Sequence, residues 1–197
     1  MPRPKSKTRQ AILESALAHF WFHGFAKSSM DDLVSATDAS RHAIYAEFGS
    51  KDGLFEAVLG HYVDTIVTPA FAQVEAPDAG LQEIAGYWEF QIVRGEQAGL
   101  PGPGCLLANM MTERAPHACE VAKVVVAHNE RLRVGFRNAL RGQGIAARHR
   151  SSKQAIDGMA RVLAIFSNGL WSYSRVTADA RALRLATKAM ITNLAQE

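Results

Sequence analysis

The sequence has few cysteines and no long run of apolar residues. Only Cys105 and Cys119 occur among the 197 residues, and they do not have the paired spacing of a zinc module. No apolar run approaches the ~20 residues that a membrane-spanning helix needs, and the segment after Met1 lacks the apolar stretch of a signal peptide. These absences argue against a membrane protein, a secreted disulfide scaffold and a cysteine-based metal site. They favour a cytoplasmic protein with reduced thiols.

Neither sign of charge dominates, but the charges are distributed unevenly. The net charge is +3, from 22 basic and 19 acidic residues. Residues 1–10 carry four basic side chains and no acidic one, whereas residues 11–59 carry three basic and seven acidic ones. Residues 60–130 carry three basic and nine acidic side chains, and residues 131–197 carry twelve and three. This asymmetry favours contact with a polyanion but does not locate it.

Strand-like alternation is also scarce. Apolar residues recur at helical spacing along nearly the whole chain, and the 48% hydrophobic content is typical of a globular domain. We therefore expect an all-α fold. About nine helices are predicted, over approximately residues 8–24, 28–38, 40–49, 50–69, 81–92, 106–112, 116–139, 151–170 and 177–194.

Cap and breaker residues set several of these boundaries. Ser28 or Ser29, Ser40 and Ser50 are suited to cap the second, third and fourth helices. Pro69 predicts a kink or an early end of the fourth helix. Ser151 or Ser152 is expected to cap the eighth helix, and Thr177 the ninth.

The second and third helices have the spacing of a helix-turn-helix, with Asp38 in the tight turn. A helix that reads DNA needs short polar or small residues in its N-terminal half so that its backbone lies deep in the major groove. Ser40, Arg41 and His42 meet this need, while Ile44 lies where it can anchor the opposite face.

A specific series of residues surrounds this motif. It comprises "IL" at 12–13, Phe20, "GF" at 24–25, Ser29 with Asp32 and Leu33, and "IYAEFGSK" at 44–51. Over about residues 8–59 the chain resembles the TetR family of bacterial transcriptional regulators. The resemblance implies a three-helix DNA-binding domain, residues 1–50, and a ligand-binding and dimerisation domain, residues 51–197. It also implies a homodimer formed through the helices at 151–170 and 177–194.

The resemblance assigns roles to individual residues. Ser29, Tyr45 and Lys51 would touch phosphates, Arg41 and His42 would face base edges, and the basic tail would reach a phosphate backbone or a minor groove. The candidate DNA-binding residues are Lys5, Arg9, Ser29, Ser40, Arg41, His42, Tyr45 and Lys51.

Three positions depart from the family pattern. Asp38 replaces a usual glycine, but aspartate tolerates the left-handed conformation, so the turn should survive. His42 replaces a small residue, which implies an unusual base preference. Glu47 stands where histidine or tyrosine is common, and an acid there would repel DNA or point away from it.

The C-terminal part offers candidates for an apolar pocket with a few polar groups. These are Tyr62, Trp88, Gln91, Asn109, Met110, Glu113, His128, Phe166 and Trp171. His128 also fits a hydrogen-bonded core residue. Cys105 opens a helix, where a lowered pKa would suit a redox or electrophile sensor, but it also fits a small buried core residue.

The leading hypothesis is a repressor that leaves a palindromic operator when a small-molecule effector binds the C-terminal domain. The alternatives are a constitutive DNA-binding regulator without an effector and an all-helical enzyme that uses Cys105. We expect no enzyme activity, no cofactor and no metal, although His19 and His23 are four residues apart on one helix. We expect the basic run at 131–153 to be a solvated surface.

Overall fold

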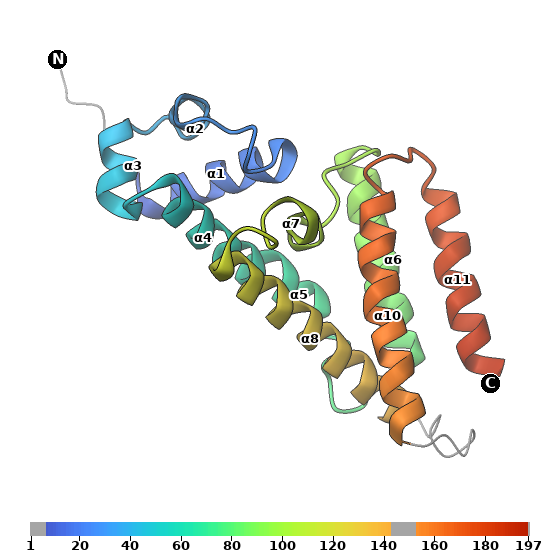
Figure 1. The fold of residues 1–197 in the computed structure, drawn as a ribbon. Coiled ribbons are helices and arrows are strands. Elements are labelled where there is room, and N and C mark those ends of the chain that lie inside the picture. Colours follow the sequence, from blue (N-terminus) through green and yellow to red (C-terminus); the bar gives the residue numbers. More distant parts are fainter. Residues whose placement is uncertain (1–6, 143–152, 197) are drawn as a thin grey trace.

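The computed structural model describes residues 7–142 and 153–196, and within these ranges the chain is helical without a strand. The all-α prediction is confirmed. Figure 1 shows the helices within residues 9–48 at one end, the helices at 81–98, 153–173 and 180–196 at the other, and the helices within 51–71 and at 119–142 running diagonally between them. The helices are α1 (Arg9–His23), α2 (Met30–Thr37), α3 (Arg41–Phe48), α4 (Lys51–Tyr62), the π-helical η1 (Val63–Val67), α5 (Thr68–Phe71), α6 (Leu81–Ala98), α7 (Leu106–Glu113), α8 (Cys119–Gly142), α10 (Lys153–Tyr173) and α11 (Ala180–Gln196).

Side-chain caps begin the N-terminal helices. Ser29 forms a reciprocal capping box with Asp32 at the start of α2. The Ser40 hydroxyl accepts the N–H of the third residue of α3, and Ser50 does the same for α4. Asp38 ends α2 with φ of 52° and ψ of 30°, which confirms that aspartate can occupy the left-handed turn. These caps fix α2, the turn and α3 as a local unit.

The fourth helix continues past Pro69 instead of ending there. The π-helical segment η1 comes directly before α5, and Pro69 lies in the first turn of α5. A proline nitrogen has no hydrogen to donate, so a regular α-helix would lose one backbone hydrogen bond at this point. The wider π turn absorbs the irregularity and keeps one continuous rod from residue 51 to residue 71. The sequence predicted a kink or an early end at Pro69 and did not reveal the π-helical turn that precedes it.

Two helix pairs build the C-terminal part. The most extensive packing is between α8 and α10, and α11 packs on α6. An aromatic cluster of Phe71, Tyr87, Trp88 and Phe136 fills the space among α5, α6 and α8. The core is therefore continuous from the short helices into the long ones.

Two predicted boundaries need correction. The helix expected from residue 116 begins at Cys119, because residues 114–117 form a turn after α7. Thr177 does not cap the last helix. Asp179 does so, since its Oδ1 atom accepts the N–H groups of Arg181 and Ala182. The expected caps Ser151 and Ser152 and the basic connection at 143–150 lie outside the described residues.

Candidate nucleic-acid interface and ligand cavity

Helix α3 has one buried face and one open face. Ile44 is fully buried and Phe48 is partly buried against the core. Arg41, His42 and Tyr45 are exposed, and Tyr45 keeps 42% of its surface accessible. Figure 1 shows α3 at the end of the molecule remote from α10 and α11. In the described part of the chain, the residues expected to read DNA thus share a solvent-exposed surface.

Two arginines of this surface form ion pairs with carboxylates. Arg41 forms an ion pair with Asp31 of α2, and Arg9 pairs with Glu47 at 3.0 Å. The Arg9 guanidinium also lies 5.3 Å from the ring centre of Phe48. Glu47 is therefore neutralised by Arg9 rather than left to repel a phosphate. These pairs are exposed, so each is weak and can be exchanged for a phosphate contact.

The remaining candidates are placed differently. The Lys51 ammonium turns inward, donates to the carbonyl of Phe25 at 2.8 Å and lies 4.1 Å from the Phe25 ring centre. Burial lowers the pKa of Lys51. The Ser29 hydroxyl is committed to the capping box with Asp32. Lys5 lies outside the described residues. The interface in this conformation therefore rests on α3 and Arg9 more than on Lys51.

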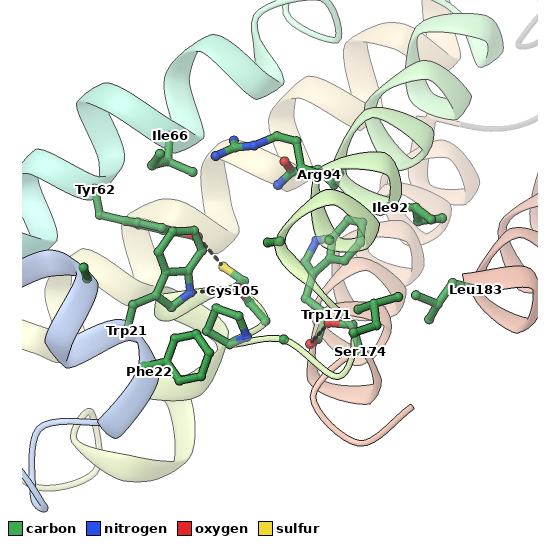
Figure 2. A pocket seen from close by; sticks show the side chains of 18 residues that line it. Trp21, Phe22, Tyr62, Ile66, Ile92, Arg94, Cys105, Trp171, Ser174 and Leu183 are labelled. Atoms are coloured by element: carbon green, nitrogen blue, oxygen red, sulfur yellow. Dashed lines mark hydrogen bonds between the residues drawn. The ribbon is translucent and has the colours of Figure 1, made fainter. Parts of the chain in front are cut away.

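A cavity of about 300 Å³ lies between α1 and the C-terminal helices. Figure 2 shows Trp21 and Phe22 on one side and Trp171 and Ser174 on the other. The wall comprises Ala18, Trp21, Phe22, Tyr62, Ile66, Gln91, Ile92, Arg94, Gly95, Ala98, Leu100, Gly102, Pro103, Gly104, Cys105, Trp171, Ser174 and Leu183. Three side chains selected from the sequence, those of Tyr62, Gln91 and Trp171, belong to it.

The other pocket candidates lie outside this lining. Trp88 is fully buried, donates its indole N–H to Ser167 and packs at 5.1 Å against Phe166. The Asn109 amide donates to the backbone of Pro103, and Met110 is fully buried. Helical periodicity identifies residues that face inward but does not tell tight packing from a void.

His128 is a core residue of α8. It is 7% exposed, and its Nδ1 atom has no hydrogen-bond partner among the described residues. Burial, with a smaller contribution from the nearby Arg131 charge, lowers its pKa to about 4. The side chain is therefore neutral at physiological pH. It does not line the cavity.

The sequence did not single out the cavity residues on α1 or on the loop at 100–104. Trp21 and Phe22 lie at the end of an amphipathic helix. The helical spacing of its apolar residues assigns only Phe20 of this turn to the core. Arg94 interrupts the apolar face of α6, and this interruption was the one available signal. The proline and glycine content of residues 100–104 indicated a loop but not that it closes a cavity.

Cys105 borders the cavity beside Tyr62. Its thiol is 3.5 Å from the Tyr62 hydroxyl, which also accepts the Leu106 N–H at 3.4 Å. Burial raises the pKa of the Cys105 thiol, and a hydrogen bond with Tyr62 opposes this only in part. The expectation of a lowered pKa is therefore wrong, because burial outweighs the position at the start of α7. The thiol is protonated, unlike that of a reactive cysteine.

The short N-terminal helices are tied directly to the wall of the cavity. The Trp21 indole N–H donates to the carbonyl of Gly104 at 2.9 Å. At the other end of α7, a Glu113 carboxylate oxygen accepts the N–H of Ala26 at 2.8 Å. Arg114 pairs with Asp52 at the start of α4. Glu113 thus links the two parts of the chain instead of facing the cavity.

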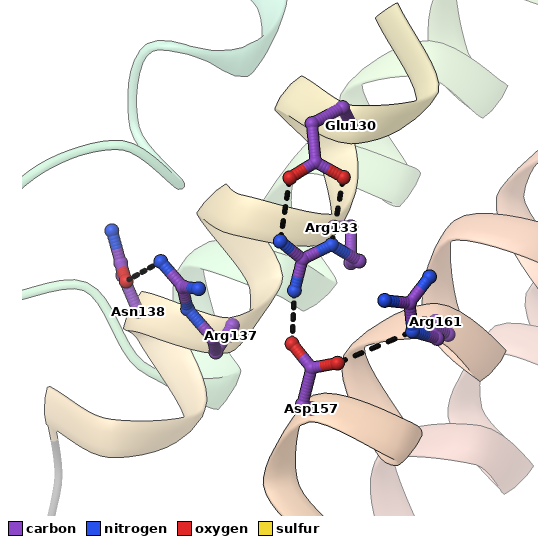
Figure 3. Close-up of polar contacts among 6 residues, drawn as sticks. All are labelled: Glu130, Arg133, Arg137, Asn138, Asp157 and Arg161. Atoms are coloured by element: carbon purple, nitrogen blue, oxygen red, sulfur yellow. Dashed lines mark hydrogen bonds and ion pairs between the residues drawn. The ribbon is translucent and has the colours of Figure 1, made fainter. Parts of the chain in front are cut away.

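The basic run that begins at residue 131 is paired with acids. Arg131 contacts both carboxylate oxygens of Glu75, at 2.7 and 2.6 Å. Figure 3 shows Arg133 between Glu130 of α8 and Asp157 of α10. Arg131 thus links α8 to the turn after α5, and Arg133 links α8 to α10, so these two cations of the run are committed to ion pairs within the chain.

Two further expectations concern metals and membranes. The rings of His19 and His23 lie 4.6 Å apart, and the described residues contain no group of three side chains suited to hold a metal ion. Within the same residues, no helix is long and apolar enough to cross a bilayer.

Comparison with known proteins agrees with this geometry. Residues 12–58 match the family model for bacterial regulatory proteins of the tetR family. Residues 12–58, which run from α1 into α4, therefore form a DNA-binding domain of the TetR type. The chain is 32% identical to the HTH-type transcriptional repressor ComR of Escherichia coli (strain K12) over 123 residues, 62% of its length. The match spans only 59% of the length of ComR.

A second relative is similar along nearly the whole chain. The uncharacterised HTH-type transcriptional regulator YezE of Bacillus subtilis (strain 168) is 24% identical over 91% of this chain and 92% of its own length. Among solved structures, the TetR family transcriptional regulator CifR in complex with a 26-base-pair operator DNA has a TM-score of 0.80. It is 22% identical and covers 96% of this chain and 98% of its own. A TetR-family regulator of Cytophaga hutchinsonii also has a TM-score of 0.80, at 19% identity over 95% of this chain and 93% of its own. These likenesses show that the fold is shared.

Proposed function

We propose that this chain is a DNA-binding transcriptional repressor that reads a palindromic operator with α3. The observation that carries the proposal is the open face of α3, on which Arg41, His42 and Tyr45 are exposed while Ile44 fixes the helix to the core. Relatives that are repressors, such as ComR, support repression rather than activation. A regulator of this kind acts on the chromosome, so a cytoplasmic location and the absence of enzyme activity are parts of the same proposal.

Dimerisation through α10 and α11 would supply the two reading helices that a palindrome needs. These two helices and the turn after α10 carry large apolar side chains that the described part of the chain leaves exposed. Ile165 is 72% exposed and Leu185 is 60% exposed, and Val162, Tyr173 and Val176 extend the surface. Several large apolar side chains exposed on two neighbouring segments of a chain are expected at a protein–protein interface. A two-fold axis here would place two copies of α3 at successive major grooves, about 34–36 Å apart.

Sedimentation velocity tests this interface. Ile165→Glu places a charge in the proposed contact without disturbing the monomer core, so we expect a monomer. Val126→Glu is the matched control, because Val126 is 66% exposed but lies on α8. A dimer that persists in Ile165→Glu would refute this part of the proposal.

A small-molecule effector would act through the cavity. Its wall includes α1 of the proposed DNA-binding domain, residues 1–50, together with helices of the proposed ligand-binding domain, residues 51–197. An effector would therefore contact both domains at once. If it favours a different spacing of the two α3 helices, operator affinity falls by the ratio of its affinities for the two states. The alternative is a constitutive regulator that has no effector. Dissociation of the protein–DNA complex by a molecule that binds the cavity would favour the effector-responsive repressor over this alternative.

Footprinting and gel shifts on the DNA upstream of the chain's own gene test the reading face. Arg41→Ala and His42→Ala should each lose about 1–3 kcal/mol of specific binding, which is roughly 5- to 150-fold. Arg141→Ala is the matched control, since Arg141 is exposed in the last turn of α8, outside both α3 and the proposed contact of α10 and α11. A protected palindrome is expected. Equal binding by all four proteins, or no protected site at moderate salt, would refute the proposal.

A further inference from the structure

The cavity has an electrostatic character that its surroundings do not share. Residues 60–130 carry nine acidic and only three basic side chains. None of the acidic residues lines the cavity, whereas Arg94 does. Among the described residues, Arg94 is the one charged member of a wall that is otherwise aromatic, aliphatic or uncharged. The wall is therefore positive within an acidic part of the chain.

The carboxylates nearest to Arg94 along α6 are held elsewhere. Glu89 and Glu96 both bind Arg184 of α11, at 2.8 and 2.5 Å. This double pair also lowers the pKa of Glu96, so the acid stays ionised and committed to Arg184. Both carboxylates therefore lie on the face of α6 that packs on α11, where Arg184 binds them. Neither one neutralises Arg94.

Arg94 itself has no ion pair or hydrogen bond among the described residues. Its recorded contact is with the face of Phe90, whose ring centre lies 5.8 Å from the guanidinium carbon. Figure 2 shows the side chain extended over the cavity toward Ile66. Gln91, one helical turn earlier on the same face, also lines the cavity. Five N–H donors of a half-buried guanidinium are therefore available beside an uncharged amide.

The size and walls define the rest of the occupant. The volume of about 300 Å³ is roughly twice the ~150 Å³ of a cavity that holds one benzene, so a molecule of about two rings fits. Trp21, Phe22 and Trp171 supply aromatic faces. Offset stacking on these rings favours a flat aromatic or similarly apolar body.

We infer that the effector is an amphipathic organic anion, with a flat apolar body of about two rings and a carboxylate or equivalent group bound by Arg94. A guanidinium and a carboxylate form the strongest common charge-assisted hydrogen bonds, and a partly closed apolar site strengthens them. A cation would meet Arg94 with no acid in the wall to offset the repulsion. This inference rests on the proposed function, because it names the chemical class to which the regulator responds.

Isothermal titration calorimetry on the full chain tests this class with three probes of one shape. The probes are naphthoate, the neutral naphthamide and the cationic naphthylmethylammonium. Naphthoate should bind at least about tenfold more tightly than the ammonium, and Arg94→Gln should weaken naphthoate about tenfold or more. Naphthamide should change less than twofold in that variant. Arg141→Gln, an exposed arginine on α8, is the matched control and should change none of the three.

The result that overturns the inference is equal or tighter binding of the ammonium, unchanged naphthoate affinity in Arg94→Gln, or no binding of any probe. Gel shifts without probe, on the same preparations, keep the proposed function separate. Loss of specific DNA binding with the probe order intact would refute the regulator and not the anion site. Intact DNA binding with the wrong probe order would refute the anion site alone.

Discussion

Replacing Gly24 by alanine should destabilise the chain through two separable effects. Gly24 ends α1 with φ of 78° and ψ of 173°, a region open almost only to glycine. A residue with a Cβ atom there costs about 1–3 kcal/mol. The added Cβ would also lie 2.9 Å from both carboxylate oxygens of Glu113. That carboxylate holds the N–H of Ala26, so moving it away costs about 1–2 kcal/mol more.

A double-mutant cycle measures the two effects. Gly24→Ala, Glu113→Ala and the double variant are unfolded in urea at one fixed protein concentration, because a dimer's stability depends on concentration. Gly24→Ala alone should lower the free energy of unfolding by about 2–5 kcal/mol. In the Glu113→Ala background only the backbone strain remains, so the same change should cost about 1–3 kcal/mol.

The outcomes are distinct. An equal cost in both backgrounds, within about 0.5 kcal/mol, would mean that the carboxylate does not constrain Gly24. A cost below about 1 kcal/mol in both would refute the strain argument itself. Hydrogen exchange at Ala26 should rise in Glu113→Ala and identifies where the link is lost.

Three other perturbations have defined outcomes. Gly135→Ala places a Cβ 2.5 Å from a ring carbon of Phe71, so the free energy of unfolding should fall by about 1–3 kcal/mol, and an unchanged urea midpoint would contradict this packing. His128 has a folded-state pKa of about 4, below the 6.5 of the unfolded chain, so the unfolded state binds more protons and stability falls as pH drops below 6.5. The free energy of unfolding should fall by about 2 kcal/mol between pH 7 and pH 5. This loss should be absent in His128→Leu and present in the control His117→Leu, which changes an exposed histidine. If His128→Leu still shows the loss, other titrating groups cause it. Ser40→Ala removes the α3 cap and should cost about 1 kcal/mol by urea unfolding, and no change would mean that the cap contributes nothing measurable.

The N-terminal helices were predictable because local chemistry decides them. Ser29, Ser40 and Ser50 cap the helices that their positions indicated, and Asp38 makes the expected turn. Each of these depends on residues within four positions in the sequence. The correction at Thr177 is small, because Asp179 performs the same task two residues later.

The cavity was largely unpredictable, since it is defined by side chains that fail to meet. Tyr62 and Trp171 were found as inward aromatic residues, but Trp88 has the same pattern and is fully packed. Whether an inward residue touches a neighbour or a void depends on contacts between helices far apart in the chain. The prediction of a lowered pKa for Cys105 was wrong for a related reason. Burial by elements distant in the sequence raises the pKa of the thiol more than its position at a helix N-terminus lowers it.

The indole of Trp21 has a practical consequence for anyone who wishes to retune this regulator as a biosensor. Trp21 belongs to α1, yet it forms part of the cavity wall and is hydrogen-bonded to the loop at Gly104. Changing it to admit a new molecule would also remove the hydrogen bond between α1 and the loop at Gly104. Ala98 and Leu100 line the same cavity from outside α1, so libraries at these two positions would vary the cavity wall and keep that hydrogen bond.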